Sequence, residues 1–142
     1  MTKDAVVAGQ TDGTLRVAAA AVVVEGRLLV VSKTVAPEVF YLPGGKPDPG
    51  EDALAALRRE LREELGVEPV RPEPLAEVEA VAALEGVPML MTVFTAGLTC
   101  EPQPAAELAD MRWVVGNEPG LVLAPAVRDQ VLPLLRSKGL IE

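Results

Sequence analysis

Histidine is absent from this 142-residue chain, and its absence excludes several kinds of chemistry. Without it there is no Ser-His-Asp or Cys-His triad, no histidine-ligated zinc site and no phosphohistidine intermediate. Cysteine occurs once, at Cys100, which excludes an internal disulfide and a metal site built from several cysteines. With no histidine to activate its thiol, Cys100 is predicted to be inert rather than nucleophilic.

Basic residues and long apolar runs are also scarce. The chain has 13 Lys and Arg against 21 Asp and Glu, a formal net charge of −8. Such a surface repels a nucleic-acid backbone, so no stable nucleic-acid binding is expected, although one small anion held through a divalent cation is compatible. The longest apolar run, residues 17–24, is far shorter than the roughly 20 residues of a membrane span. We therefore expect no membrane association and a soluble, cytoplasmic protein.

The length fits one domain, because domains typically contain roughly 100–200 residues. Residues 1–13 are polar, show little periodicity and lack the hydrophobic stretch of a signal peptide. We predict a flexible N-terminal lead-in over 1–13 and a single domain over 14–142.

Two segments have the pattern of β-hairpins. Apolar residues 16–24 and 27–32 flank a Glu-Gly pair, and residues 75–84 and 87–98 flank a second one. A short strand is expected at 111–115. Together these segments predict a sheet-rich domain.

The C-terminal segment has apolar residues at helical spacing. This spacing predicts a helix over residues 124–138 that ends before Gly139. Pro133 falls inside the helix and is expected to kink it, because proline has no backbone N–H.

The most informative segment lies between the two hairpins. Residues 42–50 are dense in proline and glycine and predict a loop. Residues 51–65 predict a helix that Gly66 ends. Its leucines form one stripe that is expected to pack against the sheet: Leu54, Leu57, Leu61 and Leu65.

Three glutamates of this helix, Glu60, Glu63 and Glu64, have the spacing that brings side chains together on one patch. The three negative charges repel one another and need a compensating positive charge. A Mg²⁺ ion provides this charge best, because it prefers oxygen ligands. The alternative is a solvated helix face with ion pairs to Arg58, Arg59 and Arg62. Gly44 and Gly45, just before the helix, allow the backbone to approach a ligand or donate a carbonyl.

Loop and helix together resemble the signature of the Nudix hydrolases. Gly45 is followed by five residues, Glu51, seven residues and then the sequence Arg-Glu-Leu-Arg-Glu-Glu-Leu-Gly-Val at 59–67. The match covers every defining position of the signature over 23 residues, from Gly45 to Val67. The resemblance implies an α/β fold, an α/β/α sandwich with a central mixed β-sheet. It also implies an enzyme that uses Mg²⁺ or Mn²⁺ to cleave a nucleoside diphosphate linked to another group.

The resemblance also implies roles for individual residues. The metal ligands would be Glu60 and Glu64, with Glu63 sharing the metal cluster and the Gly45 carbonyl as a backbone ligand. Arg59 would orient the glutamates with Glu51 as its partner, and Glu60 is favoured to deprotonate or position the attacking water. The expected catalytic residues are thus Glu51, Arg59, Glu60 and Glu63.

A further glutamate from a later loop often joins sites of this family. Glu107 is our candidate and Glu101 the alternative, and either could instead be a solvated loop acid. Trp113 is expected to serve packing rather than base stacking, and Cys100 stays outside the site.

Substrate contacts are expected from Gly44, Gly45, Lys46 and Tyr41. Phe40 and Tyr41 could flank a nucleobase, and the alternative is hydrophobic support of the loop. The expected partner is a small nucleotide, and a homodimer is left open.

Residues typical of individual Nudix subfamilies are missing from this chain, and their absence narrows the substrate class by elimination. ADP-ribose enzymes tend to carry a proline where this chain has Ala82 and Ala83, and dinucleoside polyphosphate enzymes often place a tyrosine there, whereas the only tyrosine is Tyr41. The favoured reaction is cleavage of a (deoxy)nucleoside triphosphate to the monophosphate and pyrophosphate, for example to remove oxidised nucleotides. Alternatives are an ADP-ribose, nucleotide-sugar or dinucleoside polyphosphate hydrolase, or a catalytically idle Nudix domain that serves as nucleotide sensor or scaffold.

Overall fold

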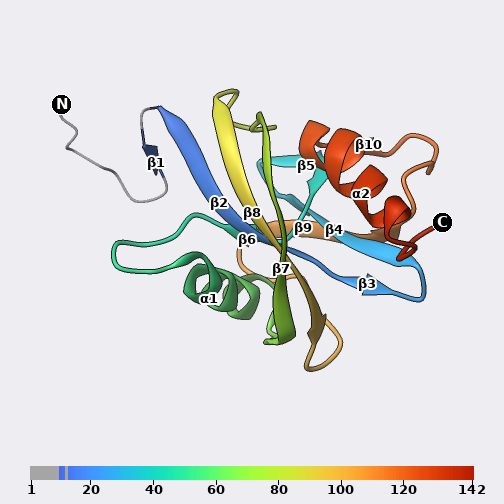
Figure 1. Ribbon diagram of the computed structural model, residues 1–142, viewed down its shortest axis with the longest axis horizontal. Coiled ribbons are helices and arrows are strands. Elements are labelled where there is room, and N and C mark those ends of the chain that lie inside the picture. The colour runs from blue at the N-terminus through green and yellow to red at the C-terminus, as the bar shows by residue number, and fades with distance from the viewer. Residues whose placement is uncertain (1–9, 12) are drawn as a thin grey trace.

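Two mixed β-sheets form the centre of the protein in the computed structural model, which describes residues 10–11 and 13–142 (Figure 1). The first sheet has the order β1 (Gln10–Thr11), β2 (Thr14–Ala21), β8 (Pro88–Leu98) and β7 (Pro69–Val81), with β6 (Gly44–Gly45) also paired to β2. The second has the order β10 (Val122–Leu123), β5 (Ala36–Tyr41), β4 (Arg27–Lys33) and β3 (Val23–Val24), with β9 (Leu108–Val114) also paired to β4. The predicted mixed-sheet α/β class is confirmed, with the strands divided between two sheets.

Helices lie on opposite sides of these strands (Figure 1). On one side is α1 (Ala53–Leu65), and on the other a π-helical turn, η1 (Val127–Val131), continues into α2 (Leu132–Ser137). The buried side chains form two clusters, one under each helical side. Strand β4 contributes to both, with Leu28 and Val30 in one cluster and Leu29 and Val31 in the other. The central strands are therefore buried on both faces, as in a sandwich of three layers.

The second predicted hairpin is confirmed, because β7 and β8 pair in antiparallel register from Pro69↔Leu98 to Val81↔Pro88. The first is wrong over most of its length. Only β3 pairs with β4, whereas β2 pairs in parallel with β8. Strand β2 runs through the centre of the molecule, where residues 18–21 are at most 1% exposed. A continuous apolar run suits a parallel strand buried on both faces better than one arm of a hairpin.

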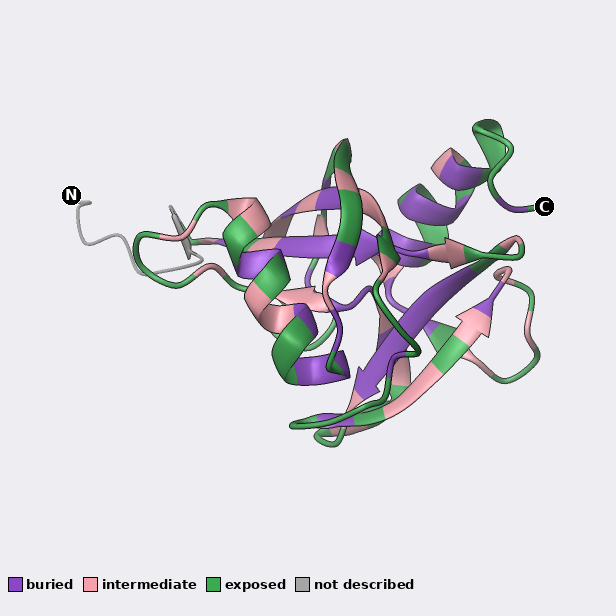
Figure 2. Cartoon of the chain, turned by 90° about the horizontal axis from the view of Figure 1, so that it is seen from below, coloured by how far each residue is buried: buried purple, intermediate pink, exposed green. Residues whose placement is uncertain are grey.

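Helix α1 begins two residues later than predicted, at Ala53. Asp52 is its N-cap, and the Asp52 Oδ1 atom accepts a hydrogen bond of 2.8 Å from the Ala55 N–H, so Glu51 lies before the helix. Gly66 ends the helix in the left-handed conformation at φ 68°, as predicted. Figure 2 shows its buried positions on the side that faces the strands, and of the leucine stripe only Leu54 is half-buried rather than buried.

The C-terminal helical segment begins at Pro125, one residue later than predicted, and its residues Val127–Val131 are π-helical. Pro133 stands at the start of α2 and cannot donate a backbone hydrogen bond to the preceding turn, so the predicted interruption is confirmed. The predicted strand at 111–115 is present as part of β9.

The lead-in predicted for 1–13 falls mainly on residues 1–9 and 12, which lie outside the described residues, while Gln10–Thr11 pair with β2. In the described part of the chain, no helix is long and apolar enough to cross a membrane.

Candidate active site

The glycines before α1 bring the backbone against the site. Contrary to the predicted loop, Gly44 and Gly45 form a short strand, β6, which pairs with Ala19 and Ala18 of β2. A Cβ atom at Gly44 would collide with the β2 backbone, and one at Gly45 would collide with the Glu60 carboxylate. Only glycine therefore allows β2, β6 and Glu60 to approach one another this closely.

Arg59 connects the loop to the glutamates. Its Nε and Nη2 atoms donate to the two carboxylate oxygens of Glu51 at 2.8 and 3.0 Å, a bidentate pair, and Nη2 also donates to the Lys46 carbonyl at 3.0 Å. Its Nη1 atom donates to Glu60 at 3.2 Å and to Glu63 at 3.3 Å. The Arg59 guanidinium, followed by the Asp48 backbone N–H, lowers the pKa of Glu51 to about 2.

The three helix glutamates differ in burial. Glu64 is 3% exposed, and the side chain of Glu60 is 16% exposed, whereas that of Glu63 is 55% exposed. Glu60 and Glu64 thus point inward, and Glu63 lies at the solvent edge of α1. In these side-chain positions, no group of three or more acidic side chains within residues 10–11 and 13–142 forms a ready-made metal cage.

Burial dominates the electrostatics of the inner pair. It raises the pKa of Glu64 to about 8, and the nearby Glu60 carboxylate adds to the rise while Lys33 opposes it. Burial also raises the pKa of Glu60, against the effect of Arg59. The Glu64 Oε1 atom is buried and has no hydrogen-bond partner among the described residues. A buried carboxylate with an unpartnered oxygen and a half-buried one beside it fit an oxygen-preferring divalent cation, which would compensate both charges.

A cavity of about 290 Å³ has Glu60 in its wall, whereas Glu64 is not among the residues that line it. Its polar wall includes several predicted site residues: Tyr41, Gly44, Gly45, Lys46, Glu60 and Glu107. Its apolar wall comes mainly from β2, β8, the tip of the β7–β8 hairpin and the start of η1: Leu15, Val17, Met89, Met91, Val81, Ala82, Ala83, Leu84, Ala126 and Val127. The cavity thus has carboxylate oxygens and two lysines in its polar wall, and its other wall is an apolar surface suited to a nucleoside.

The sequence analysis missed Lys33. This residue ends β4 and lines the cavity, and its Nζ atom lies 3.3 Å from a carboxylate oxygen of Glu107. The available signal was a lysine two residues after the apolar run 28–31, which predicts a charged group at the end of a central strand.

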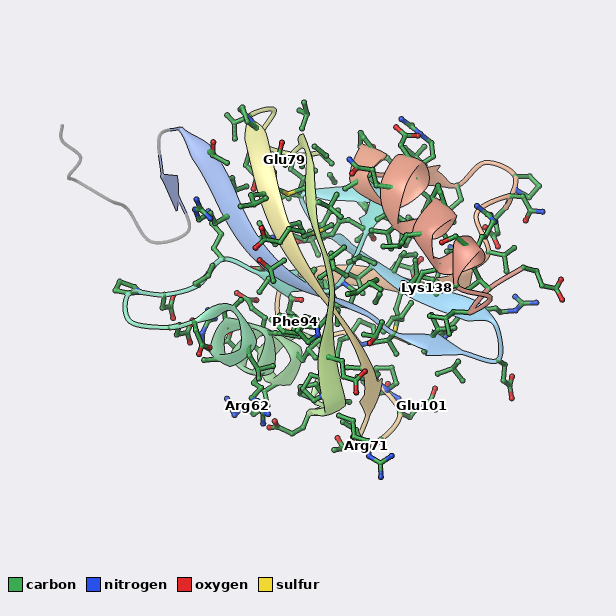
Figure 3. All side chains as sticks on the ribbon, viewed as in Figure 1. Arg62, Arg71, Glu79, Phe94, Glu101 and Lys138 are labelled. Carbon is green, nitrogen blue, oxygen red and sulfur yellow. The ribbon has the colours of Figure 1, made fainter. Side chains whose placement is uncertain are left out.

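Other predicted residues lie elsewhere. Glu101 is not among the residues that line the cavity and lies at the lower edge of the molecule in Figure 3. Phe40 is buried in the core with the Arg112 guanidinium 5.6 Å from its ring centroid, and it is not among the residues that line the cavity. Trp113 is half-buried against the cluster under α1, as expected for packing, and Cys100 is exposed.

Comparisons with known proteins agree with this geometry. A family model described as a NUDIX domain matches residues 14–135. The crystal structure of a MutT NUDIX hydrolase from Burkholderia pseudomallei is 29% identical with a TM-score of 0.67, over 79% of this chain and 92% of that one. The solution structure of the E. coli ORF135 protein is 27% identical with a TM-score of 0.65, over 87% of each chain.

A third structure shares the fold alone. The NUDIX domain of Shewanella oneidensis NrtR, solved in complex with ADP ribose, is 21% identical with a TM-score of 0.69, over 88% of each chain. Among curated proteins, none matches the sequence significantly.

Proposed function

Because the chain belongs to the Nudix hydrolase family, we propose that it is a Mg²⁺-dependent pyrophosphohydrolase that cleaves a nucleoside diphosphate linked to another group. One observation carries this proposal. The buried Glu64, with its unpartnered Oε1 atom, stands one helical turn from the half-buried Glu60, and Glu60 lines a cavity that has both charged and apolar walls.

Glu60 and Glu64 would hold the cation, with the Gly45 carbonyl as a backbone ligand and Glu63 as an outer one. Bound Mg²⁺ or Mn²⁺ would supply neutralisation of phosphate oxygens and a lowered pKa for water. Exposed Glu63 accepts a hydrogen bond from Arg59 through its Oε1 atom at 3.3 Å, and its second carboxylate oxygen would serve this role. Carboxylate and carbonyl oxygens are the donor set that Mg²⁺ prefers.

The chain's own residues supply positioning and the base. Arg59, fixed by Glu51 and the Lys46 carbonyl, restricts the Glu60 carboxylate to the cavity wall. Displacement at phosphorus needs a water molecule delivered in line and a group that takes its proton, and Glu60 is our candidate for this group. Lys33 and Lys46 supply positive charge for the phosphates, and Glu107 is proposed as a further acid of the site.

The favoured substrate is a (deoxy)nucleoside triphosphate, cleaved to the monophosphate and pyrophosphate. The position of Ala82 and Ala83 in the apolar wall supports this choice, because the proline mark of ADP-ribose enzymes is missing at the residues that would meet the nucleoside. ADP ribose stays in the test panel because the similar NrtR domain was solved with it. We further propose a cytoplasmic protein that acts on a small nucleotide.

The proposal is tested with a panel of nucleoside triphosphates, oxidised nucleotides, ADP ribose, a nucleotide sugar and dinucleoside polyphosphates. We expect release of pyrophosphate or nucleotide products with Mg²⁺ and none with EDTA. Glu60→Gln should reduce turnover by roughly 10²- to 10⁴-fold, as loss of a general base does. Binding without turnover across the panel would instead support the idle sensor and contradict the proposed reaction.

A further inference from the structure

The hydroxyl of Tyr41 is a buried polar group for which the fold provides no partner. Tyr41 ends β5, and its neighbours Phe40 and Leu42 are 3% and 4% exposed within the core cluster under α2. Because side chains alternate along a strand, the Tyr41 side chain is directed to the other face of the sheet. There it lies beside Val31, its cross-strand partner in β4. Its Oη atom is buried, yet it makes no hydrogen bond with any described residue. Such a group is unfavourable unless something else satisfies it.

The cavity is the place from which a partner can come. Tyr41 lines it together with Gly45, Lys46 and Glu60. The carboxylates of three glutamates act electrostatically on the Tyr41 phenol: Glu64, Glu107 and Glu85. Burial, followed by these acids, raises the pKa of Tyr41, so the hydroxyl keeps its proton at every physiological pH. The group is therefore a permanent hydrogen-bond donor at the polar wall.

Strand register places part of the apolar wall away from Gly45. Gly45 lies beside Ala18, while Val17 and Leu15 run away from it along β2 next to Met91 and Met89 of β8. Tyr41 lines the same cavity as Lys33, Lys46 and Glu60. A ligand group rich in acceptor oxygens satisfies both the lysines and the phenol, whereas a flanked nucleobase would leave the hydroxyl unpartnered.

We propose that the Tyr41 hydroxyl donates a hydrogen bond to a non-bridging oxygen of the substrate's diphosphate, which makes Tyr41 a phosphate-binding residue of this site. The inference rests on the proposed function, because it assumes that the diphosphate occupies this cavity. It replaces the earlier idea that the ring of Tyr41 flanks a base.

The test compares Tyr41→Phe, which removes only the hydroxyl, with Tyr41→Leu, which also removes the ring. Trp113→Phe is the control, since Trp113 is half-buried but lies outside the residues that line the cavity. Affinity is measured in Mg²⁺ for imidodiphosphate and for a non-hydrolysable nucleoside triphosphate analogue, and kcat/KM on the substrate found in the panel. For Tyr41→Phe we expect both affinities and kcat/KM to fall about 10- to 100-fold, as for a lost hydrogen bond to a charged group. Its thermal midpoint without ligand should equal or exceed that of the wild type, because an unpartnered buried hydroxyl has been removed.

Each other outcome has a defined meaning. Unchanged affinities in Tyr41→Phe overturn the proposal, and so does a loss confined to Tyr41→Leu, which would assign the effect to the ring. A fall in activity that only parallels a lower thermal midpoint would make Tyr41 structural. A wild-type protein that binds imidodiphosphate without turnover contradicts the proposed reaction, while the affinity of Tyr41→Phe still decides this assignment. A wild-type protein that binds neither analogue contradicts both.

Discussion

Arg59 joins four parts of the site through one guanidinium group: Glu51, the Lys46 carbonyl, Glu60 and Glu63. The bidentate pair with Glu51 fixes the plane of the guanidinium, and the remaining Nη1 atom can then reach the glutamates. A lysine at this position could not reproduce these contacts, because an ammonium group lacks the planar fork. The signature arginine therefore serves geometry as much as charge.

Replacing Glu51 tests this arrangement through pH. The pKa of Glu51 is about 2 in the folded protein against an ordinary 4.5, so its ionised form favours folding above pH 4.5 and this contribution is lost as pH falls toward 2. Glu51→Gln should lower the thermal midpoint at pH 7, and the difference from wild type should shrink to zero near pH 2. Thermal unfolding between pH 2 and 7 checks this, with the exposed Glu101→Gln as control. A difference that does not change with pH would contradict the assigned pairing.

The raised pKa of Glu64 predicts that the stability of the metal-free protein depends on pH in the opposite direction. The pKa of Glu64 rises to about 8 on folding, so the folded state binds this proton more tightly than the unfolded state does. The stability of the EDTA-treated protein should therefore fall as pH increases from 4.5 to 8, and Glu64→Gln should flatten that slope. Magnesium should reverse the trend for the wild type, because the cation must displace the proton. An identical slope in wild type and variant would show that Glu64 does not titrate in this way.

Strand β6 owes its place to two glycines that no other residue can replace. Gly45→Ala would put a methyl group into the Glu60 carboxylate and should reduce turnover by 10-fold or more, as small displacements of catalytic groups do. Gly97→Ala is the matched control, because its added carbon would meet only Val70 at 3.7 Å and 3.9 Å, which are ordinary contacts. Both variants are compared by kcat/KM and circular dichroism. Wild-type turnover in Gly45→Ala would contradict the contact between β6 and Glu60.

The anchoring of α1 is open to the same kind of test. On α1, the side chain of Leu61 is fully buried on the core-facing side, next in sequence to the site glutamates. The side chain of Leu54 is only half-buried. Leu61→Ala should lower the free energy of unfolding by about 2–5 kcal/mol, and Leu54→Ala by less. Urea unfolding measures both. Equal losses would contradict the orientation of α1.

Local sequence signals predicted the elements whose determinants are local. Gly66 marked the end of α1, the Glu-Gly turn marked the β7–β8 hairpin, and Pro133 marked the break in the C-terminal helix. The parallel pairing of β2 with β8 joins Leu15 to Met89, and no neighbouring residue records such a distant partner. The first hairpin was therefore wrong because tertiary pairing overrides a local turn signal.

Prediction of the site was limited in the same way. The signature spacing named Glu51, Arg59 and the glutamates, and the structure places Arg59 on Glu51. It could not rank the glutamates by burial, because the orientation of α1 against the sheets turns Glu63 outward. Lys33 of β4 and Tyr41 of β5 both line the cavity, and their two strands are paired in the sheet. This tertiary pairing has no signal in the local sequence.

Across the whole molecule, the cavity lies where several parts of the fold meet: β2 and β8, the loop before α1, the tip of the β7–β8 hairpin and the start of the C-terminal helix. A ligand there contacts elements from both sheets. Mg²⁺ with a non-hydrolysable nucleotide should therefore stabilise the entire domain, by about 2.7 kcal/mol when the free ligand is at 100 times its Kd. Thermal unfolding of the wild type with and without the two ligands measures this. No shift under these conditions would contradict binding to the folded domain.

The negative net charge of the molecule makes nucleotide binding depend on Mg²⁺. A net charge of −8 and the glutamates Glu60 and Glu64 at the site oppose an anionic nucleotide unless a divalent ion is present. The most direct measurement is calorimetric titration of Mg²⁺ into the wild type, Glu64→Gln and the surface control Glu101→Gln, followed by turnover of the same samples. We expect the wild type and Glu101→Gln to bind Mg²⁺ and to be active, and Glu64→Gln to lose both properties. Equal Mg²⁺ binding and turnover in all three proteins would contradict the assignment of Glu60 and Glu64 as the metal-binding centre.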